Sequence, residues 1–230
     1  SEAKSRGFDV TAIVKPGSAD RLDPGYSVME KSLYDLTAKD LEGFDAVVDA
    51  FGTFSYGPGS EDMHVTCLEH LITVFKELPE VRLLVVGGAG SLYTDEKKSG
   101  LVADTIPEAY RAVPTAMAEA FAKLKESGIN WTYFSPAPFF DPNGRRTGKY
   151  ILSTDYRIHN SMGDAAISYA DYAIAMVDEI EKCRFAGCRF TAVSDTSFVQ
   201  NEAGYNLFNI ATTPFTRRGS FFGVYTPRSG

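Results

Sequence analysis

Four short stretches of small, aromatic or basic residues follow directly after strand-like segments of the sequence. They are Lys15-Pro16-Gly17, Ala50-Phe51-Gly52-Thr53, Gly87-Gly88-Ala89-Gly90-Ser91 and Ser135-Pro136-Ala137-Pro138. In an open parallel sheet, ligands bind at the carboxyl ends of the strands. Three of the four stretches are rich in small residues, which let a ligand approach the backbone closely. These stretches are therefore the first candidates for a binding site.

The glycine cluster from Gly87 to Gly90 resembles a phosphate-binding turn only in part. The dinucleotide fingerprint GxGxxG opens a helix, and its phosphate lies at that helix N-terminus. Here the residues from Ser91 to Asp95 read as a loop. We interpret the cluster as a flat backbone floor beneath a nicotinamide ring or a substrate.

Metal and redox sites are not indicated by the cysteines and histidines. Cys67, Cys183 and Cys188 form no CxxC pair, and we expect reduced thiols packed in the core. His64 and His70 are six residues apart, so they do not share a helix face as a pair four apart would. The sequence predicts no metal site.

The composition excludes several classes of partner. The chain has 230 residues and a net charge of −7, and its basic residues are scattered, which disfavours nucleic-acid binding. No apolar run approaches the roughly 18 residues of a membrane span, and the sequence shows no basic-then-apolar pattern of the kind expected for a leader. We expect a cytoplasmic protein whose partner is a small molecule.

Strand-like and helix-like segments alternate, which is typical of a parallel sheet covered by helices on both faces. The expected fold is α/β, a Rossmann-like doubly wound parallel sheet in one domain over residues 1–195. Expected strands are Val10–Lys15, Tyr26–Leu33, Asp45–Phe51, Val81–Val86, Trp131–Phe134 and Arg189–Val193. Expected helices are Ser1–Arg6, Met63–Leu78, Pro114–Ser127 and Ile167–Glu181.

The periodic pattern fades beyond Thr196. The tail, residues 196–230, is aromatic, mildly basic and rich in Thr, Gly and Pro. So many exposed aromatic side chains are poorly suited to free solution. The tail is expected either to pack across the sheet, to reach a second subunit in a homo-oligomer, or to form a loosely ordered extension.

Several segments together resemble a known group of proteins. They are "GFDVTAIVK", "YDLT" followed by "GFDAVVDAFG", "LLVVGGAGSLY", "WTYFSPAPFF" and "ISYADYAIAMVDEIE". Their order and spacing are similar to those of atypical short-chain dehydrogenase/reductases of the NmrA-like, NAD(P)H-binding group, which includes NADH-flavin reductases and the biliverdin reductase B type. The resemblance covers residues 1–193 and implies a Rossmann-like fold with a nicotinamide cofactor.

The resemblance also implies that a first unit is lacking. Members of the group begin with a strand, a GxxGxxG turn and a helix, and the last turns of that helix match Ser1–Arg6. That turn supplies the backbone N–H groups that hold the pyrophosphate of the cofactor. We therefore expect the chain to bind its cofactor less efficiently than a member that carries this unit.

The resemblance assigns the candidate cofactor residues. Lys15 matches the position that meets the adenosine 2′-phosphate, which favours NADP over NAD, although a solvated lysine would fit the sequence as well. Asp35 and Leu36 match the residues that read the adenine edge. Ala50, Phe51 and Gly52 lie along the adenosine ribose, Gly87, Gly88 and Ala89 back the nicotinamide half, and Ser135, Pro136 and Ala137 lie near the carboxamide.

Catalytic residues are only partly matched. Classical members use Ser, Tyr and a Lys four residues after the Tyr, which lowers the pKa of the phenol. Ser91 and Tyr110 are the candidates, but Pro114 stands where that lysine belongs. Tyr93 and Lys97 have the spacing but follow a strand directly, so we interpret that match as chance.

Three functions remain open from the sequence. The first is an NAD(P)H-dependent oxidoreductase that passes a hydride to a planar acceptor such as a flavin or a quinone, which needs little help with proton transfer. The second is a non-catalytic NADP(H) sensor of the NmrA-like type. The third is a paralogue that has lost cofactor binding.

Overall fold

The computed structural model describes all residues except 1, 23, 54–58, 196–220 and 228–230. Its helices are α1 (Glu2–Ser5), α2 (Ala38–Leu41), α3 (Met63–Phe75), α4 (Ala112–Glu126) and α5 (Tyr169–Lys182). Its strands are β1 (Phe8–Val14), β2 (Ser27–Glu30), β3 (Ala46–Ala50), β4 (Arg82–Val86), β5 (Trp131–Ser135), β6 (Phe139–Asp141), β7 (Tyr150–Ser153), β8 (Ala166–Ser168), β9 (Cys188–Ser194) and β10 (Phe221–Pro227).

The described residues form two compact units. Unit 1 consists of the described residues within Ser1–Val86, Glu119–Tyr133 and Phe215–Gly230. Unit 2 consists of the described residues within Gly87–Ala118 and Phe134–Pro214. In unit 1 the strand order is β2-β1-β10-β3-β4, followed by the first three residues of β5. The pairs β1–β2 and β3–β4 are parallel.

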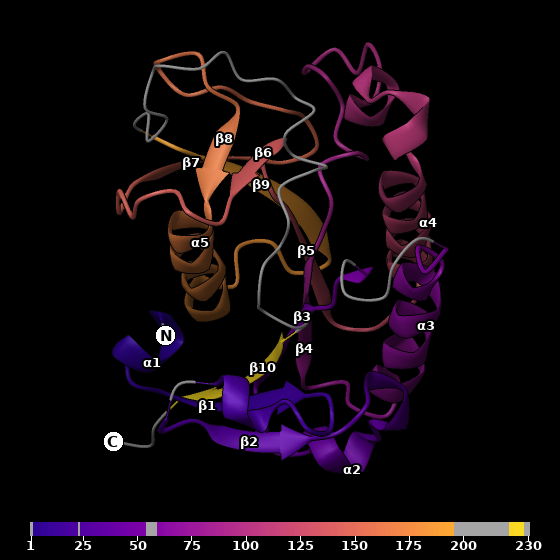
Figure 1. Cartoon of the computed structure of the whole chain (residues 1–230), viewed down its shortest axis with the longest axis vertical. Helices are drawn as coiled ribbons and strands as arrows, with labels where there is room; N and C mark the ends of the chain where they lie inside the picture. The colour runs from indigo at the N-terminus through magenta and orange to yellow at the C-terminus, as the bar shows by residue number, and fades with distance from the viewer. Residues whose placement is uncertain (1, 23, 54–58, 196–220, 228–230) are drawn as a thin grey trace. The chain divides into compact units, whose positions relative to one another are not determined.

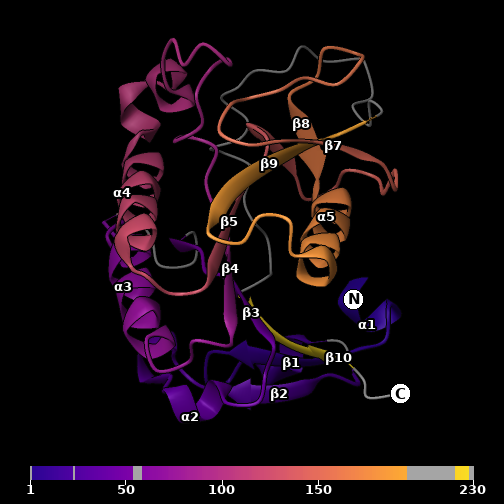
Figure 2. The ribbon, with the colours of Figure 1, turned by 180° about the vertical axis from the view of Figure 1, so that it is seen from behind.

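The strand β10 lies between β1 and β3 and runs antiparallel to both. Its register with β1 extends from Phe8↔Pro227 to Ile13↔Phe222, and its register with β3 extends from Phe221↔Ala50 to Tyr225↔Ala46. Figures 1 and 2 show this yellow strand beside β1 from two sides. The expected α/β fold is confirmed, but the sheet of unit 1 is mixed.

The helices of unit 1 bury the faces that their sequence spacing predicts. In α3 the buried side chains include Leu68, Leu71, Ile72 and Phe75, which recur at helical intervals. The second half of α4 belongs to the same unit, and Lys123 there pairs with Glu69 of α3 at 2.8 Å. The apolar face of α3 is thus buried in the core, and the Lys123–Glu69 pair links α3 to the second half of α4 at the surface.

Unit 2 is built around stacked aromatic rings. The ring of Phe134 stacks on Tyr172 at 3.8 Å and on Phe190 at 4.0 Å between centroids. The hydroxyl of Tyr172 also donates to the Phe134 carbonyl at 2.7 Å. The helix α5 begins at a Ser168 cap whose hydroxyl accepts from the backbone N–H of Asp171. In this unit β7 and β9 pair antiparallel, and β6 and β8 form a separate parallel pair.

The structure differs from the expected elements in several places. The strands β6, β7, β8 and β10 were not expected, because three of them have only three or four residues and β10 lies in the aperiodic tail. Cys67 is buried, but the expectation of core packing is wrong for Cys183 and Cys188, which are exposed. Cys183 caps the end of α5 and Cys188 begins β9, so both lie at element ends.

None of the helices in the described part of the chain is both long enough and apolar enough to cross a membrane.

Replacing Val224 with proline tests the position of β10. Val224 is paired with Thr11 on one side and with Val47 on the other. Proline has no N–H, and its ring disturbs a strand that is paired on both edges, so Val224→Pro should destabilise the protein by about 3 kcal/mol or more. Urea unfolding measures the loss. Val224→Thr is the matched control, because it keeps the backbone donor and the β-branched shape; equal midpoints for both variants would contradict the assigned position.

Candidate functional site

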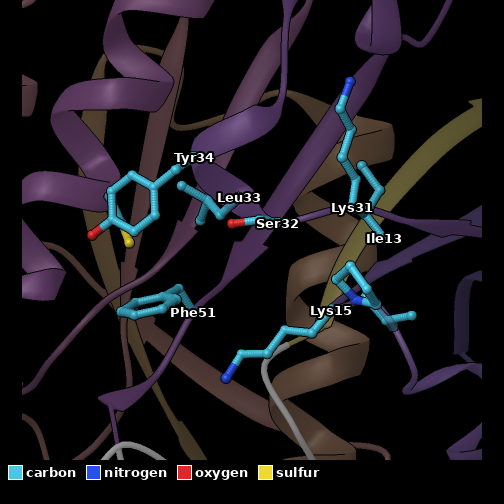
Figure 3. A pocket seen from close by; sticks show the side chains of 10 residues that line it. Ile13, Lys15, Lys31, Ser32, Leu33, Tyr34 and Phe51 are labelled. Atoms are coloured by element: carbon cyan, nitrogen blue, oxygen red, sulfur yellow. The ribbon is translucent and has the colours of Figure 1, made fainter.

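A pocket with a volume of about 290 Å³ lies at the carboxyl ends of β1 and β3 in unit 1. The end of β1, the turn that follows it, the residues after β2, Phe51 and α3 contribute to it (Figure 3). Its lining residues are Ile13, Val14, Lys15, Pro16, Lys31, Ser32, Leu33, Tyr34, Phe51 and Cys67. This is the edge of the sheet at which a ligand is expected.

Two aromatic side chains form one side of the pocket. Figure 3 shows Tyr34 and Phe51 near each other, across from Ile13. The hydroxyl of Tyr34 is within 2.7 Å of the Thr66 hydroxyl, which holds the ring from α3. The ring of Phe51 packs edge to face against the imidazole of His64, with 5.5 Å between the ring centroids. The backbone N–H of Phe51 donates to the carboxylate of Asp49 at 2.8 Å. Contacts on the side away from the pocket thus hold both rings in place. Their faces suit a flat, largely apolar ligand.

The two lysines of the pocket point in different directions. In Figure 3 the amine of Lys15 extends toward the Phe51 side, whereas Lys31 extends away from the rings. Lys31 is paired with Asp40 at 2.6 Å, and this hydrogen bond, together with one from Thr37, lowers the pKa of Asp40 to about 2. The direction of its side chain places the positive charge of Lys15 on the ring side of the pocket, where an anionic substituent of a ligand would meet it.

Burial shifts the pKa values of three side chains around the pocket. Burial raises the pKa of Asp49 to about 6 and lowers that of His64 to about 4. Burial also raises the pKa of the Cys67 thiol to about 11, against the smaller lowering effect of its hydrogen bond with Tyr34. At neutral pH the Cys67 thiol is therefore protonated and the His64 imidazole is neutral, and a protonated thiol is a poor nucleophile.

The glycine cluster of unit 2 is packed so closely that larger residues would not fit. A Cβ at Gly90 would lie 2.7 Å from the Cβ of Pro114, and one at Gly88 would lie 3.0 Å from the sulfur of Met117. The backbone N–H of Gly87 donates to the carbonyl of Phe134 at 2.8 Å. The start of α4 therefore lies directly against this loop, and Pro114, which stands at the sequence position expected for a lysine, packs against Gly90.

The two candidate catalytic residues have different surroundings. The Ser91 hydroxyl accepts from Nη1 of Arg189 at 3.0 Å, and Arg189 in turn pairs with Asp155 at 2.8 Å. Tyr110 is 40% exposed in the turn before α4. The arrangement gives Ser91 a role in holding the loop after β4. A catalytic role for either residue stays a prediction.

Ser135 is a buried polar residue without a partner in the described part of the chain. It ends β5 and is completely buried, yet its hydroxyl makes no hydrogen bond there. Pro136 and Ala137, which follow it, are also buried. An unpaired buried hydroxyl at the carboxyl end of a strand is a feature that a bound polar group would satisfy.

The expected adenosine residues divide into two groups. Lys15 and Phe51 line the pocket, and Ala50 and Gly52 flank Phe51 in the chain. Asp35 and Leu36 do not line it, and Leu36 is only 1% exposed in the core. Sequence reasoning missed Lys31, Ser32, Leu33, Tyr34 and Cys67 as lining residues. The sequence predicted a strand as far as Leu33, but β2 ends at Glu30. Lys31, Ser32 and Leu33 therefore follow the strand and line the pocket instead of belonging to the strand.

No group of three or more His, Cys, Asp or Glu side chains in the described ranges is arranged to hold a metal ion.

Replacing Asp49 with Asn tests the buried carboxyl through the pH dependence of stability. Asp49 ionises near pH 3.8 in the unfolded chain but near pH 6 in the folded protein, so its contribution to stability falls as the pH rises through this window. His64 acts in the opposite direction between about pH 4 and its unfolded value of 6.5. Asn still accepts from the Phe51 backbone but does not titrate. Between pH 4 and pH 7, the stability of Asp49→Asn should therefore rise by about 2 kcal/mol relative to that of the unchanged chain.

Urea unfolding at a series of pH values measures this difference. His64→Gln serves as the counterpart and should change the curve in the opposite sense between about pH 4 and pH 6.5, because a buried neutral imidazole favours the folded state as the pH rises. If the curves of Asp49→Asn and the unchanged chain run parallel, Asp49 is not buried as the structure places it.

The chain is similar to several known proteins. The chain is 46% identical over 197 residues to YwnB, an uncharacterised protein of Bacillus subtilis. The match covers 84% of this chain and 91% of YwnB. A solved structure from Streptococcus pneumoniae, described as a candidate NADH-flavin reductase, is 40% identical with a TM-score of 0.76 and covers 84% of this chain and 90% of that one.

A second solved structure, a candidate epimerase from Bacteroides thetaiotaomicron, is 31% identical with a TM-score of 0.71, and the match covers 85% of this chain and 90% of that one. The model of a family described as NAD(P)H-binding matches residues 1–182, which include the pocket and the glycine cluster. The chain belongs to this NAD(P)H-binding family.

Proposed function

We propose that the protein is an NAD(P)H-dependent oxidoreductase that holds the adenosine end of its cofactor in the pocket of unit 1. The observation that carries the proposal is the pocket itself, in which Tyr34 and Phe51 offer a surface for a planar ring and Lys15 offers a positive charge. Membership of the NAD(P)H-binding family supports this assignment. Adenine is a planar ring of the kind that such a surface accommodates.

We favour NADPH over NADH as the nucleotide. A basic side chain after this strand suits the 2′-phosphate of NADP, whereas a carboxylate would suit the 2′-hydroxyl of NAD. Lys15 occupies this position, and Figure 3 shows its amine on the ring side. The amine of Lys31 points away from the rings in the same view.

We propose that the acceptor is a planar molecule such as a flavin or a quinone. A bound nicotinamide would supply the hydride. Hydride transfer to such an acceptor depends mainly on alignment of the rings and requires no Tyr/Lys pair. The name of the Streptococcus pneumoniae relative makes flavin the first acceptor to test.

A non-catalytic NADP(H) sensor is the second candidate function. Two observations favour it: the Ser91 hydroxyl already accepts from Arg189, and Pro114 rather than a lysine packs against Gly90. A sensor requires the binding pocket but no acceptor site. The two functions therefore share the adenosine pocket and differ in turnover.

The cellular setting of the proposal follows from the sequence. We expect the protein to act in the cytoplasm on a small-molecule acceptor, without nucleic-acid or membrane partners. The expected contact of a homo-oligomer falls on the tail, most of which lies outside the described residues. It stays a prediction.

Lys15→Ala tests the nucleotide assignment. Loss of a charged hydrogen bond to a phosphate should weaken NADPH binding by about tenfold, whereas NADH binding should change by less than about twofold. Titration calorimetry measures both. Lys39→Ala is the matched control, because Lys39 is an exposed lysine of α2 in the same unit that does not line the pocket. Equal losses for both nucleotides would argue against the 2′-phosphate contact.

Turnover separates the remaining alternatives. NADPH oxidation in the presence of FMN or a quinone supports the oxidoreductase, and binding without turnover on any acceptor supports the sensor. If neither nucleotide binds, the chain is a paralogue that has lost its cofactor. Loss of NADPH absorbance follows the reaction.

A further inference from the structure

Glu30 lies at the carboxyl end of β2, next to the pocket but not among its lining residues. The strands β1 and β2 are parallel, and Glu30 is in register with Val14, the last residue of β1. The backbone N–H of the next residue, Lys31, donates to the carbonyl of Val14 at 2.8 Å. The Glu30 side chain therefore starts beside the turn that carries Lys15.

One carboxylate oxygen of Glu30 accepts three consecutive backbone N–H groups from this turn. The distances are 2.7 Å from Gly17, 3.1 Å from Ser18 and 3.3 Å from Ala19. The turn is closed by Ser18 donating to the Lys15 carbonyl at 3.1 Å, and Gly17 has a φ of +76° that favours glycine. Consecutive backbone N–H groups that point to one anion form a strong, charge-assisted contact.

This contact has a geometric and an electrostatic consequence. The turn that Glu30 holds carries Lys15 and Pro16, two of the lining residues, so Glu30 fixes that side of the pocket. The same contact brings a negative charge to the turn and occupies its N–H groups. A phosphate near Lys15 would therefore meet repulsion from Glu30 and find these donors already used.

We propose that Glu30 is a positioning residue that sets the preference between NADPH and NADH, an inference that rests on the proposed adenosine pocket. It holds the Lys15 turn for both nucleotides, and its charge disfavours the one that carries a 2′-phosphate. The preference for NADPH is then the balance between attraction to Lys15 and repulsion from Glu30. Glu30 touches neither reacting group and acts through the turn.

Two substitutions separate these roles. Glu30→Gln removes the charge but keeps an oxygen that accepts the three N–H groups, so NADPH should bind about threefold more tightly while NADH is unchanged. Glu30→Ala removes the charge and the anchor, so both nucleotides should bind more weakly, with the same threefold shift in their ratio toward NADPH. A merely structural role would alter both affinities equally and leave their ratio unchanged.

Titration calorimetry of the whole chain with NADPH and with NADH measures these affinities, and thermal unfolding confirms that each variant folds. Glu80→Gln is the matched control, because Glu80 is exposed and lies before β4, at the amino ends of the parallel strands. A shifted ratio in both Glu30 variants but not in Glu80→Gln establishes the proposal. An unchanged ratio, with the unchanged chain binding both nucleotides, overturns this inference alone. If the unchanged chain binds neither nucleotide, the proposed function fails with it.

Discussion

The pairing of β10 with β1 and β3 sets the separation between the two sides of the pocket. Lys15 follows β1 and Phe51 follows β3, and these strands are not neighbours because β10 lies between them. Neighbouring strands are about 4.8 Å apart, so the intervening strand holds β1 and β3 about 10 Å apart. This spacing is nearly independent of strand direction. An antiparallel strand can therefore hold the two sides of this pocket as far apart as a parallel strand would.

Strand direction does change what lies at the pocket edge. A parallel central strand would leave the sheet beside Lys15 and Phe51 and continue into a phosphate-binding turn. The antiparallel β10 instead leaves the sheet at Pro227, beside Phe8 at the amino end of β1. Within the described residues, the adenosine site that we propose consists of the aromatic rings, Lys15 and the turn that Glu30 holds. The layer behind the rings, with Thr66, His64 and Asp49, gives this pocket its rigidity.

Part of unit 1 could be predicted from the sequence, because β3 and β4 are short buried strands rich in Val and Leu. The strand predicted at Asp45–Phe51 agrees with β3 to within one residue at each end. Lys15 and Phe51, two of the predicted site residues, both line the pocket. Tyr34 was missed because its role depends on the end of β2 and on Thr66, which is 32 residues away in the chain. Such a contact leaves no local pattern. β10 was missed for a similar reason, since its partners come from the opposite end of the sequence.

The place of β10 in the sheet also affects how the chain reaches its folded state. The strand lies roughly 210 residues after β1, so a ribosome makes β1, β3 and their helices long before it makes the strand that joins them. Until then the two facing edges have unsatisfied backbone groups that other chains can pair with. Contacts between such distant segments also form slowly, because closing a long loop costs entropy before any pairing compensates for it. Completion of the sheet is therefore a late event in biosynthesis, and aggregation competes with it most strongly just before β10 emerges.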